Sequence, residues 1–144
     1  MKTVLTLILM FLLSLNVFAA GSDDDNTITK PRAYKSAIKL IKKENYSKAI
    51  AVLEKVLKNT KYQKDPDILN EYAFALRKSG DLSKAEVFYN KALDISPKHK
   101  GALEYLGELY VDTKRKDKAN LLLSKLKNCR CEEYSELKDY ISNN

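Results

Sequence analysis

Glycine, proline, cysteine and histidine are all scarce in this chain of 144 residues, which has four, three, two and one of them. So few glycines leave no glycine-rich phosphate-binding loop. A histidine-dependent catalytic triad would have to use His99, the only histidine. A zinc site would need His99 and both cysteines, Cys129 and Cys131, and Cys-x-Cys is shorter than the usual ligand spacing. We therefore predict no enzyme, no catalytic residue, no metal site and no cofactor, and we expect His99 to be solvated.

Runs of like charge are also missing, because no five consecutive residues carry the same sign. The formal net charge is +7, from 26 Lys and Arg and 19 Asp and Glu. Basic and acidic residues alternate along the chain, as they do on the solvated surface of a helical protein. We expect no nucleic-acid partner. Anionic lipid or a cell-wall polymer is the alternative that a basic exported chain would suit.

The one long apolar run lies at the N-terminus. Lys2 supplies a positive charge, residues 4–15 are apolar, and "VFA" at residues 17–19 has the small residues of a cleavage site. We predict a signal peptide over residues 1–19, an exported protein that is periplasmic or secreted, and no membrane span after cleavage. An uncleaved anchor is the alternative. Residues 20–29 contain three consecutive aspartates and no apolar periodicity, which predicts a flexible acidic linker.

Helix is expected throughout the rest of the chain. From Lys30 onward helix breakers are few, and Ala, Leu, Lys and Glu are common. Asp65 before Pro66 is a typical helix start. Gly80 before Asp81 is a helix end followed by the cap of the next helix. The predicted fold class is therefore all-α.

Apolar and small residues recur at a fixed interval. One unit carries them at Leu69, Tyr72, Ala73, Leu76, Ala85, Tyr89 and Ala92. Thirty-four residues later the same slots hold Leu103, Leu106, Gly107, Tyr110, Ala119, Leu123 and Leu126. Upstream, Ala37, Leu40, Ala49, Leu53 and Val56 fit an offset of 36, so about two residues are inserted near residues 59–65. Such self-similarity predicts stacked helix hairpins.

This pattern resembles the tetratricopeptide repeat family. The second unit matches best, with Gly80 between its helices and Pro97 at its end, whereas the third has Lys114 and Cys131 in those places. The resemblance implies a right-handed α-solenoid with a degenerate first repeat at residues 30–63 and further repeats at 66–99 and 100–131. Residues 132–142 are predicted to form a capping helix. The tail also resembles that of small exported bacterial members of the family.

Members of this family generally bind peptides on the concave surface formed by the first helix of each hairpin. The helical period predicts that this surface carries Tyr34, Ile38, Ile41, Asn70, Phe74, Arg77, Glu104, Tyr105 and Glu108. Aromatic residues and arginine are enriched in binding hot spots. The alternative for Phe74 and Ile38 is that they belong to the core between repeats and do not contact a partner. With Glu104 and Glu108 at one end, a basic or mixed, partly apolar segment suits the surface better than an acidic tail.

The predicted function is a non-enzymatic scaffold of the bacterial envelope that binds a protein or peptide. One alternative is a thiol-active protein that uses Cys129 and Cys131 for disulfide exchange or soft-metal capture. Another is an accessory subunit that associates with itself or with a larger envelope complex. For the two cysteines, a disulfide that stiffens the turn before the last helix, reduced thiols and an intermolecular bridge all stay open.

Overall fold

The computed structural model describes residues 29–144, which form seven helices and no strand. The helices are α1 (Arg32–Lys42), α2 (Tyr46–Leu57), α3 (Pro66–Lys78), α4 (Leu82–Ile95), α5 (Lys100–Asp112), α6 (Lys116–Leu126) and α7 (Glu132–Asn143). The all-α prediction is confirmed. The predicted signal peptide, and the predicted linker up to residue 28, lie outside the described residues. Within residues 29–144, no helix has both the length and the apolar character needed to cross a membrane.

The same turn closes each hairpin. One residue adopts a left-handed conformation in each, namely Glu44 (φ 57°), Gly80 (φ 95°) and Lys114 (φ 60°). The next backbone N–H then donates to a carbonyl five residues earlier, from Asn45 to Leu40 at 2.9 Å, Asp81 to Leu76 at 3.0 Å and Arg115 to Tyr110 at 2.7 Å. This bond is typical of the Schellman motif at helix ends. The turns recur at the offsets of 36 and 34 residues seen in the sequence.

The helix starts use side-chain caps where the sequence supplies them. Asp65 accepts hydrogen bonds from the backbone N–H groups of Asp67 and Ile68, at 3.0 and 3.1 Å. Asp81 accepts one from Lys84 at 3.1 Å. Each bond satisfies a donor that the first helical turn would otherwise leave unpaired. Both predicted helix starts are confirmed.

His99 is not the solvated residue that the sequence suggested. Its Nδ1 accepts a hydrogen bond from the Ala102 N–H at 3.1 Å, so His99 caps α5. Its Nε2 lies 2.9 Å from a carboxylate oxygen of Asp67. Because Nδ1 accepts, the ring proton of this tautomer is on Nε2, which donates to Asp67. Sequence reasoning missed this partner because 32 residues separate the two side chains. The pair joins the starts of α3 and α5.

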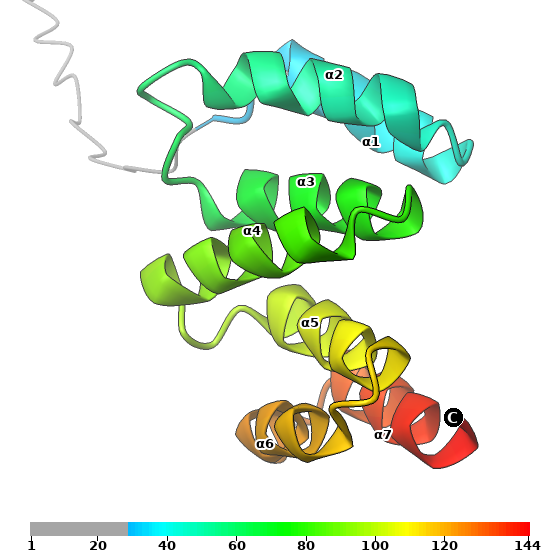
Figure 1. Ribbon diagram of the computed structural model, residues 1–144. Coiled ribbons are helices and arrows are strands. Elements are labelled where there is room, and N and C mark those ends of the chain that lie inside the picture. Colours follow the sequence, from blue (N-terminus) through cyan, green and yellow to red (C-terminus); the bar gives the residue numbers. More distant parts are fainter. Residues whose placement is uncertain (1–28) are drawn as a thin grey trace, which may run out of the picture.

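The hairpins stack one after another along the molecule, from α1 and α2 to α5 and α6 (Figure 1). Alanines in the small-residue slots, such as Ala37, Ala73 and Ala85, are fully buried. The large side chains of Tyr72 and Tyr89 fill the spaces between helices. Each hairpin thus covers an apolar face that its neighbour could not bury alone.

The last helix, α7, covers α5 and α6 and confirms the predicted cap. Its Leu137 is fully buried. A Cβ atom added at Gly107 of α5 would lie 2.6 Å from the Leu137 side chain. Only glycine therefore lets α7 approach α5 this closely. In this position α7 packs on α5 as the first helix of a further repeat would.

Candidate functional site

The concave face of the solenoid contains two adjoining cavities. The cavity on the N-terminal side, about 600 Å³, lies between α1, α3 and α5. The cavity on the C-terminal side, about 570 Å³, lies between α3, α5 and α7. Phe74 of α3 and Tyr105 of α5 line both cavities. We call this pair of cavities the groove.

An aromatic cluster lies at the middle of the groove. The rings of Phe74 and Tyr105 are tilted by 49° with their centroids 4.9 Å apart. Tyr46 contacts Phe74 edge-on with a centroid distance of 6.4 Å. Phe74 and Tyr105 are each only half-buried. They therefore offer an apolar surface from which a bound side chain could still displace water.

The N-terminal side of the groove is apolar with a basic edge. Tyr34, Ile38 and Ile41 of α1 line it together with three lysines. These lysines are Lys35, Lys39 and Lys42. Its acidic residue, Glu71, lies close to the floor, where burial raises the pKa of its carboxyl.

The C-terminal side of the groove is acidic. Glu104 and Glu108 of α5 face Glu136 and Asp139 of α7 across the cavity. Glu104 is only 3% exposed. Burial, followed by the neighbouring Glu136, raises the pKa of Glu104 to about 9, so this carboxyl is protonated at neutral pH.

Arg77 is tied into the protein at the end of the groove. Its guanidinium donates to Asp112 at 2.8 and 3.1 Å and also to Glu108. The Tyr140 hydroxyl of α7 donates to the same Asp112 at 2.7 Å. Arg77 is therefore 9% exposed and joins α3 to α5 and, through Asp112, to α7. Its charge is already matched by carboxylates of the chain itself.

Most residues predicted for the concave surface do line the groove. They are Tyr34, Ile38, Ile41, Phe74, Arg77, Glu104, Tyr105 and Glu108. The exception is Asn70, which is 3% exposed and lies against Gly101 of α5. Asn70 cannot reach a bound peptide backbone from beneath the groove, because helix packing has covered it. Binding by the other residues stays a prediction.

Sequence reasoning missed the contribution of α7 to this surface. Glu136, Asp139 and Tyr140 line the C-terminal cavity, and α7 had been expected to act as a cap only. Glu136 and Tyr140 are four residues apart and share one helix face. α7 directly follows the third repeat. This position and the four-residue spacing together would have placed Glu136 and Tyr140 beside α5.

A larger cavity, about 810 Å³, lies outside the groove between α2 and α4. Its apolar lining includes Leu57 and Phe88, and the inserted loop between α2 and α3 forms one edge. The polar groups at this edge are partly paired with one another. Glu54 accepts hydrogen bonds from the Tyr72 hydroxyl at 2.6 Å and from Lys84 at 3.0 Å. The groove, by contrast, has carboxyls that no cation of the described chain neutralises.

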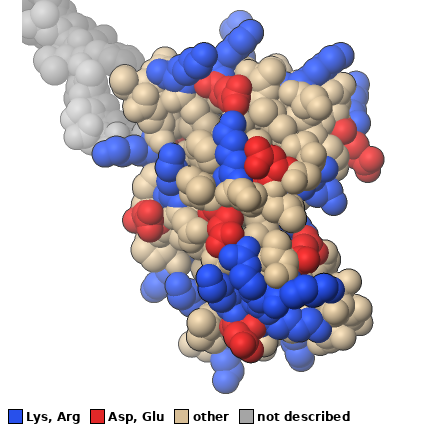
Figure 2. All heavy atoms as spheres, in the orientation of Figure 1, with Lys and Arg blue, Asp and Glu red and all other residues tan. Residues whose placement is uncertain are grey.

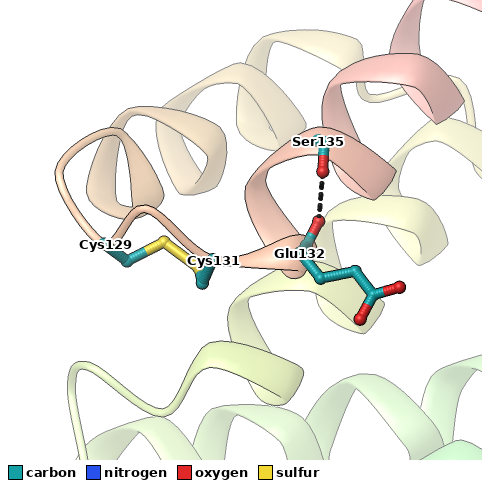
Figure 3. Close-up of a disulfide and its surroundings, with 4 residues drawn as sticks. All are labelled: Cys129, Cys131, Glu132 and Ser135. Atoms are coloured by element: carbon teal, nitrogen blue, oxygen red, sulfur yellow. Dashed lines mark hydrogen bonds between the residues drawn. A yellow bond between two sulfur atoms is a disulfide. The ribbon is translucent and has the colours of Figure 1, made fainter.

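The two cysteines lie in the turn between α6 and α7 and form a disulfide in the structure (Figure 3). Their Cα atoms are 5.2 Å apart, and Arg130 between them has a φ of 49°. Cys129 and Cys131 both pack against the core. Neither cysteine lines the groove, and Cys131 is the residue directly before the first turn of α7.

Three comparisons with known proteins bear on this fold. Residues 76–138 match the family model described as tetratricopeptide repeat. A chain of the CopN–Scc3 complex has a TM-score of 0.63 and 19% identity over 78% of this chain and 66% of that one. The Yersinia enterocolitica type III secretion chaperone SycD, in complex with a peptide of the translocator YopD, has a TM-score of 0.66 and 16% identity over 78% and 86%. Comparison with curated proteins finds no match.

At these identities the solved structures show a shared fold and nothing narrower. This chain spans slightly less than two thirds of the chain from the CopN–Scc3 complex. The family match covers the second helix hairpin in part, the third hairpin and most of α7. The predicted resemblance to the tetratricopeptide repeat family is thereby confirmed over residues 76–138. Helices α1 to α7 form a helical solenoid that shares its fold with these solved structures over 78% of the chain.

Proposed function

We propose that this chain is a non-enzymatic scaffold that binds a segment of a partner protein in the groove. The observation that carries this proposal is the pair of cavities that meet at Phe74 and Tyr105. Together they make a continuous surface with an apolar centre and polar ends, which is typical of binding sites for peptides and small ligands. The half-buried aromatic rings are the anchors that a partner's apolar side chain would contact.

The charges at the two ends of the groove give the bound segment a direction. Lys35, Lys39 and Lys42 lie at the α1 side, and Glu136 and Asp139 lie at the α7 side. A segment with an acidic side chain near α1, an apolar one at the centre and a basic one near α7 would match this pattern. Such complementarity favours one orientation of the partner over the other.

The likeness to SycD supports this proposal by analogy only. One solved SycD structure is described as a complex with a peptide of the translocator YopD. Proteins of one fold often differ in function, so the groove residues of the present chain carry the proposal.

We also propose that the protein acts in the bacterial envelope. The signal-like residues 1–19 support export. A disulfide between Cys129 and Cys131 would persist in the oxidising compartment that export reaches. Fractionation of cells, with a thiol count on the protein from each fraction, tests both points. A protein found only in the cytosol with two free thiols would contradict them.

A peptide selection tests binding in the groove. Twelve-residue peptides from a random display library would be selected on the mature chain, and their dissociation constants measured by fluorescence anisotropy. Phe74→Ala with Tyr105→Ala should weaken binding at least tenfold, because aromatic hot spots each contribute about 1 kcal/mol or more. Circular dichroism should show unchanged helicity.

Val87→Ala with Leu121→Ala is the matched control for this experiment. These two apolar side chains are 50% and 65% exposed and line neither cavity of the groove. The control should bind the selected peptides as the wild type does. Equal affinity of the Phe74 and Tyr105 double variant and the wild type would refute the groove as the binding site.

A further inference from the structure

The acidic side of the groove differs in charge from the rest of the described chain. Apart from Lys2 and the aspartates at 23–25, the chain has 25 basic and 16 acidic residues, a formal charge of +9. Figure 2 shows Lys and Arg side chains spread over one face of the molecule, with a band across its lower half. Against this background, four carboxyl groups line one cavity, from Glu104, Glu108, Glu136 and Asp139. Such a concentration of one sign attracts cations to the cavity.

The cations of the chain do not provide that counter-charge. Arg77 pairs with Glu108 and with Asp112. The Lys78 ammonium lies 5.9 Å from the centre of the Phe74 ring. Among residues 29–144, no Lys, Arg or His forms an ion pair with Glu104, Glu136 or Asp139. Three of the four carboxyl groups therefore face the cavity without a cation.

Glu104 is the most buried member of this group. It is 97% buried, and within the described residues no basic side chain or backbone N–H donates to it. Only the Glu136 carboxyl lies within hydrogen-bonding reach. Its side chain still lines the cavity. A buried carboxylate without a cation is costly, so the Glu104 carboxyl retains its proton until a cation binds.

Resting on the function proposed above, we propose that Glu104 and Glu136 together bind a basic side chain of the partner segment, an arginine guanidinium or a lysine ammonium. The exposed Glu136 gives the cation access, and Glu104 lies at the base of the cavity. A guanidinium offers a planar array of donors that can bond two carboxylate oxygens at once. A metal ion suits the site less well, because the described residues include no group of three or more side chains able to hold one.

Binding of that cation exchanges it for the proton. Glu104 gives up its proton to solvent as the guanidinium or ammonium arrives, so that two carboxylates face one positive charge. The other groups around the pair come from three helices. They are Arg77 and Lys78 of α3, Tyr105 and Glu108 of α5, and Glu133, Asp139 and Tyr140 of α7. Burial raises the pKa of Glu104 to about 9, so affinity for the cation should increase with pH up to that value.

A pair of small probes tests the site without any partner protein. The probes are n-butylguanidinium and its uncharged isostere n-butylurea, each titrated into the mature chain and followed by the ¹³C carboxyl signals of Glu104 and Glu136. The guanidinium should shift both signals, and the urea should shift neither. The affinity of the chain for n-butylguanidinium should rise by up to about tenfold per pH unit between pH 6 and 9. Calorimetry in two buffers should show nearly one proton released per cation at pH 7.

Two variants and a control assign the effect to these residues. Glu104→Gln and Glu136→Gln should each weaken guanidinium binding at least fivefold, and Glu104→Gln should also abolish proton release. Glu132→Gln, which changes an exposed residue of α7 outside the cavity, should do neither. The exposed Glu136 provides the decisive variant if the buried substitution fails to fold. Equal binding of the two probes, or unchanged binding by Glu136→Gln, would overturn the proposal.

The peptides selected above distinguish the cation site from the peptide-binding function proposed for the groove as a whole. A selected peptide with one lysine would be compared with the same peptide carrying acetyl-lysine, which keeps the stem and removes the charge. A loss of at least fivefold that depends on Glu136 supports the cation site. Peptides that need Phe74 and Tyr105 but bind equally when acetylated overturn the cation site alone. Guanidinium binding at Glu136 without peptide binding in the groove overturns the scaffold function alone.

Discussion

The first and third hairpins turn in the same way but are covered differently. No described helix precedes α1, and Ala37 is its only buried residue. In α5, the corresponding helix of the third hairpin, eight residues are buried, because α4 packs on one side and α7 on the other. The stability of each unit in a repeat protein depends on its neighbours. The first hairpin should therefore open at a lower free energy than the third.

This difference extends to the two sides of the groove. The α7 side is fixed by Arg77, which holds Glu108 and Asp112, and by the Tyr140 hydroxyl. The α1 side is held mainly by partly buried apolar side chains such as Tyr34 and Ile41. A partner segment would then meet a preformed acidic end and a basic end that can adjust. Four experiments measure this difference between the two sides of the molecule.

The largest effect is expected from Leu137→Ala, which removes the side chain of α7 that packs against α5. Leu137 is fully buried, and loss of such a side chain costs about 2–5 kcal/mol of unfolding free energy. Ile41→Ala, on the half-buried face of α1, should cost about 1 kcal/mol or less because its surroundings remain partly hydrated. Urea denaturation of both variants gives the comparison. Equal losses would show that α1 is packed as firmly as α7.

Gly107→Ala tests the same contact by overpacking. The added Cβ would lie 2.6 Å from the Leu137 side chain, so this buried side chain or the whole of α7 must shift, at a cost of about 1–3 kcal/mol. Gly101→Ala is the matched control in the same helix. Its Cβ would lie 3.4 Å from Asn70, an ordinary contact, so this variant should be neutral or slightly more stable. Thermal unfolding of both follows the change, and a Gly107 variant as stable as wild type would mean that α7 does not pack closely in solution.

The contacts within one repeat could be predicted from the sequence, because they depend on local spacing. The 36- and 34-residue offsets place the turns at Glu44, Gly80 and Lys114, as the structure has them. They also place buried alanines such as Ala85 in the small-residue slots. A helix with two neighbours must bury the same positions in each unit, so the pattern carries this information.

Contacts between repeats could not be predicted in the same way. Arg77 meets Asp112 across 35 residues, and His99 meets Asp67 across 32. Nothing in the local sequence of either partner indicates the other. The helical period placed Asn70 on the surface, but the approach of α5 at Gly101 covers it. Exposure of a groove residue depends on how closely adjacent helices pack, which a single sequence does not specify.

Cys129→Ser should have a smaller effect on the third hairpin. A disulfide across three residues closes a very short loop, and the chain-entropy relation then gives about 1–2 kcal/mol. The N-terminal turn of α7 should fray, and hydrogen exchange at Glu133 and Tyr134 should become faster. The wild type under a mild reductant is the control and should behave as the variant does. A loss well above 3 kcal/mol would indicate that the disulfide holds more than this turn.

The smallest effects are expected from substitutions in the turns of the first and third hairpins, which should raise stability instead of lowering it. Glu44 and Lys114 hold left-handed conformations that glycine adopts at less cost, so Glu44→Gly and Lys114→Gly should each stabilise their hairpin by about 0.5–1 kcal/mol. If the first hairpin opens separately, Glu44→Gly should slow hydrogen exchange in α1 and α2 and leave the global transition unchanged. Lys114→Gly should raise the global midpoint, because the third hairpin unfolds with the rest. Identical exchange profiles for the two variants would show one cooperative unit, in which the different burial of α1 and α5 has no effect on local opening.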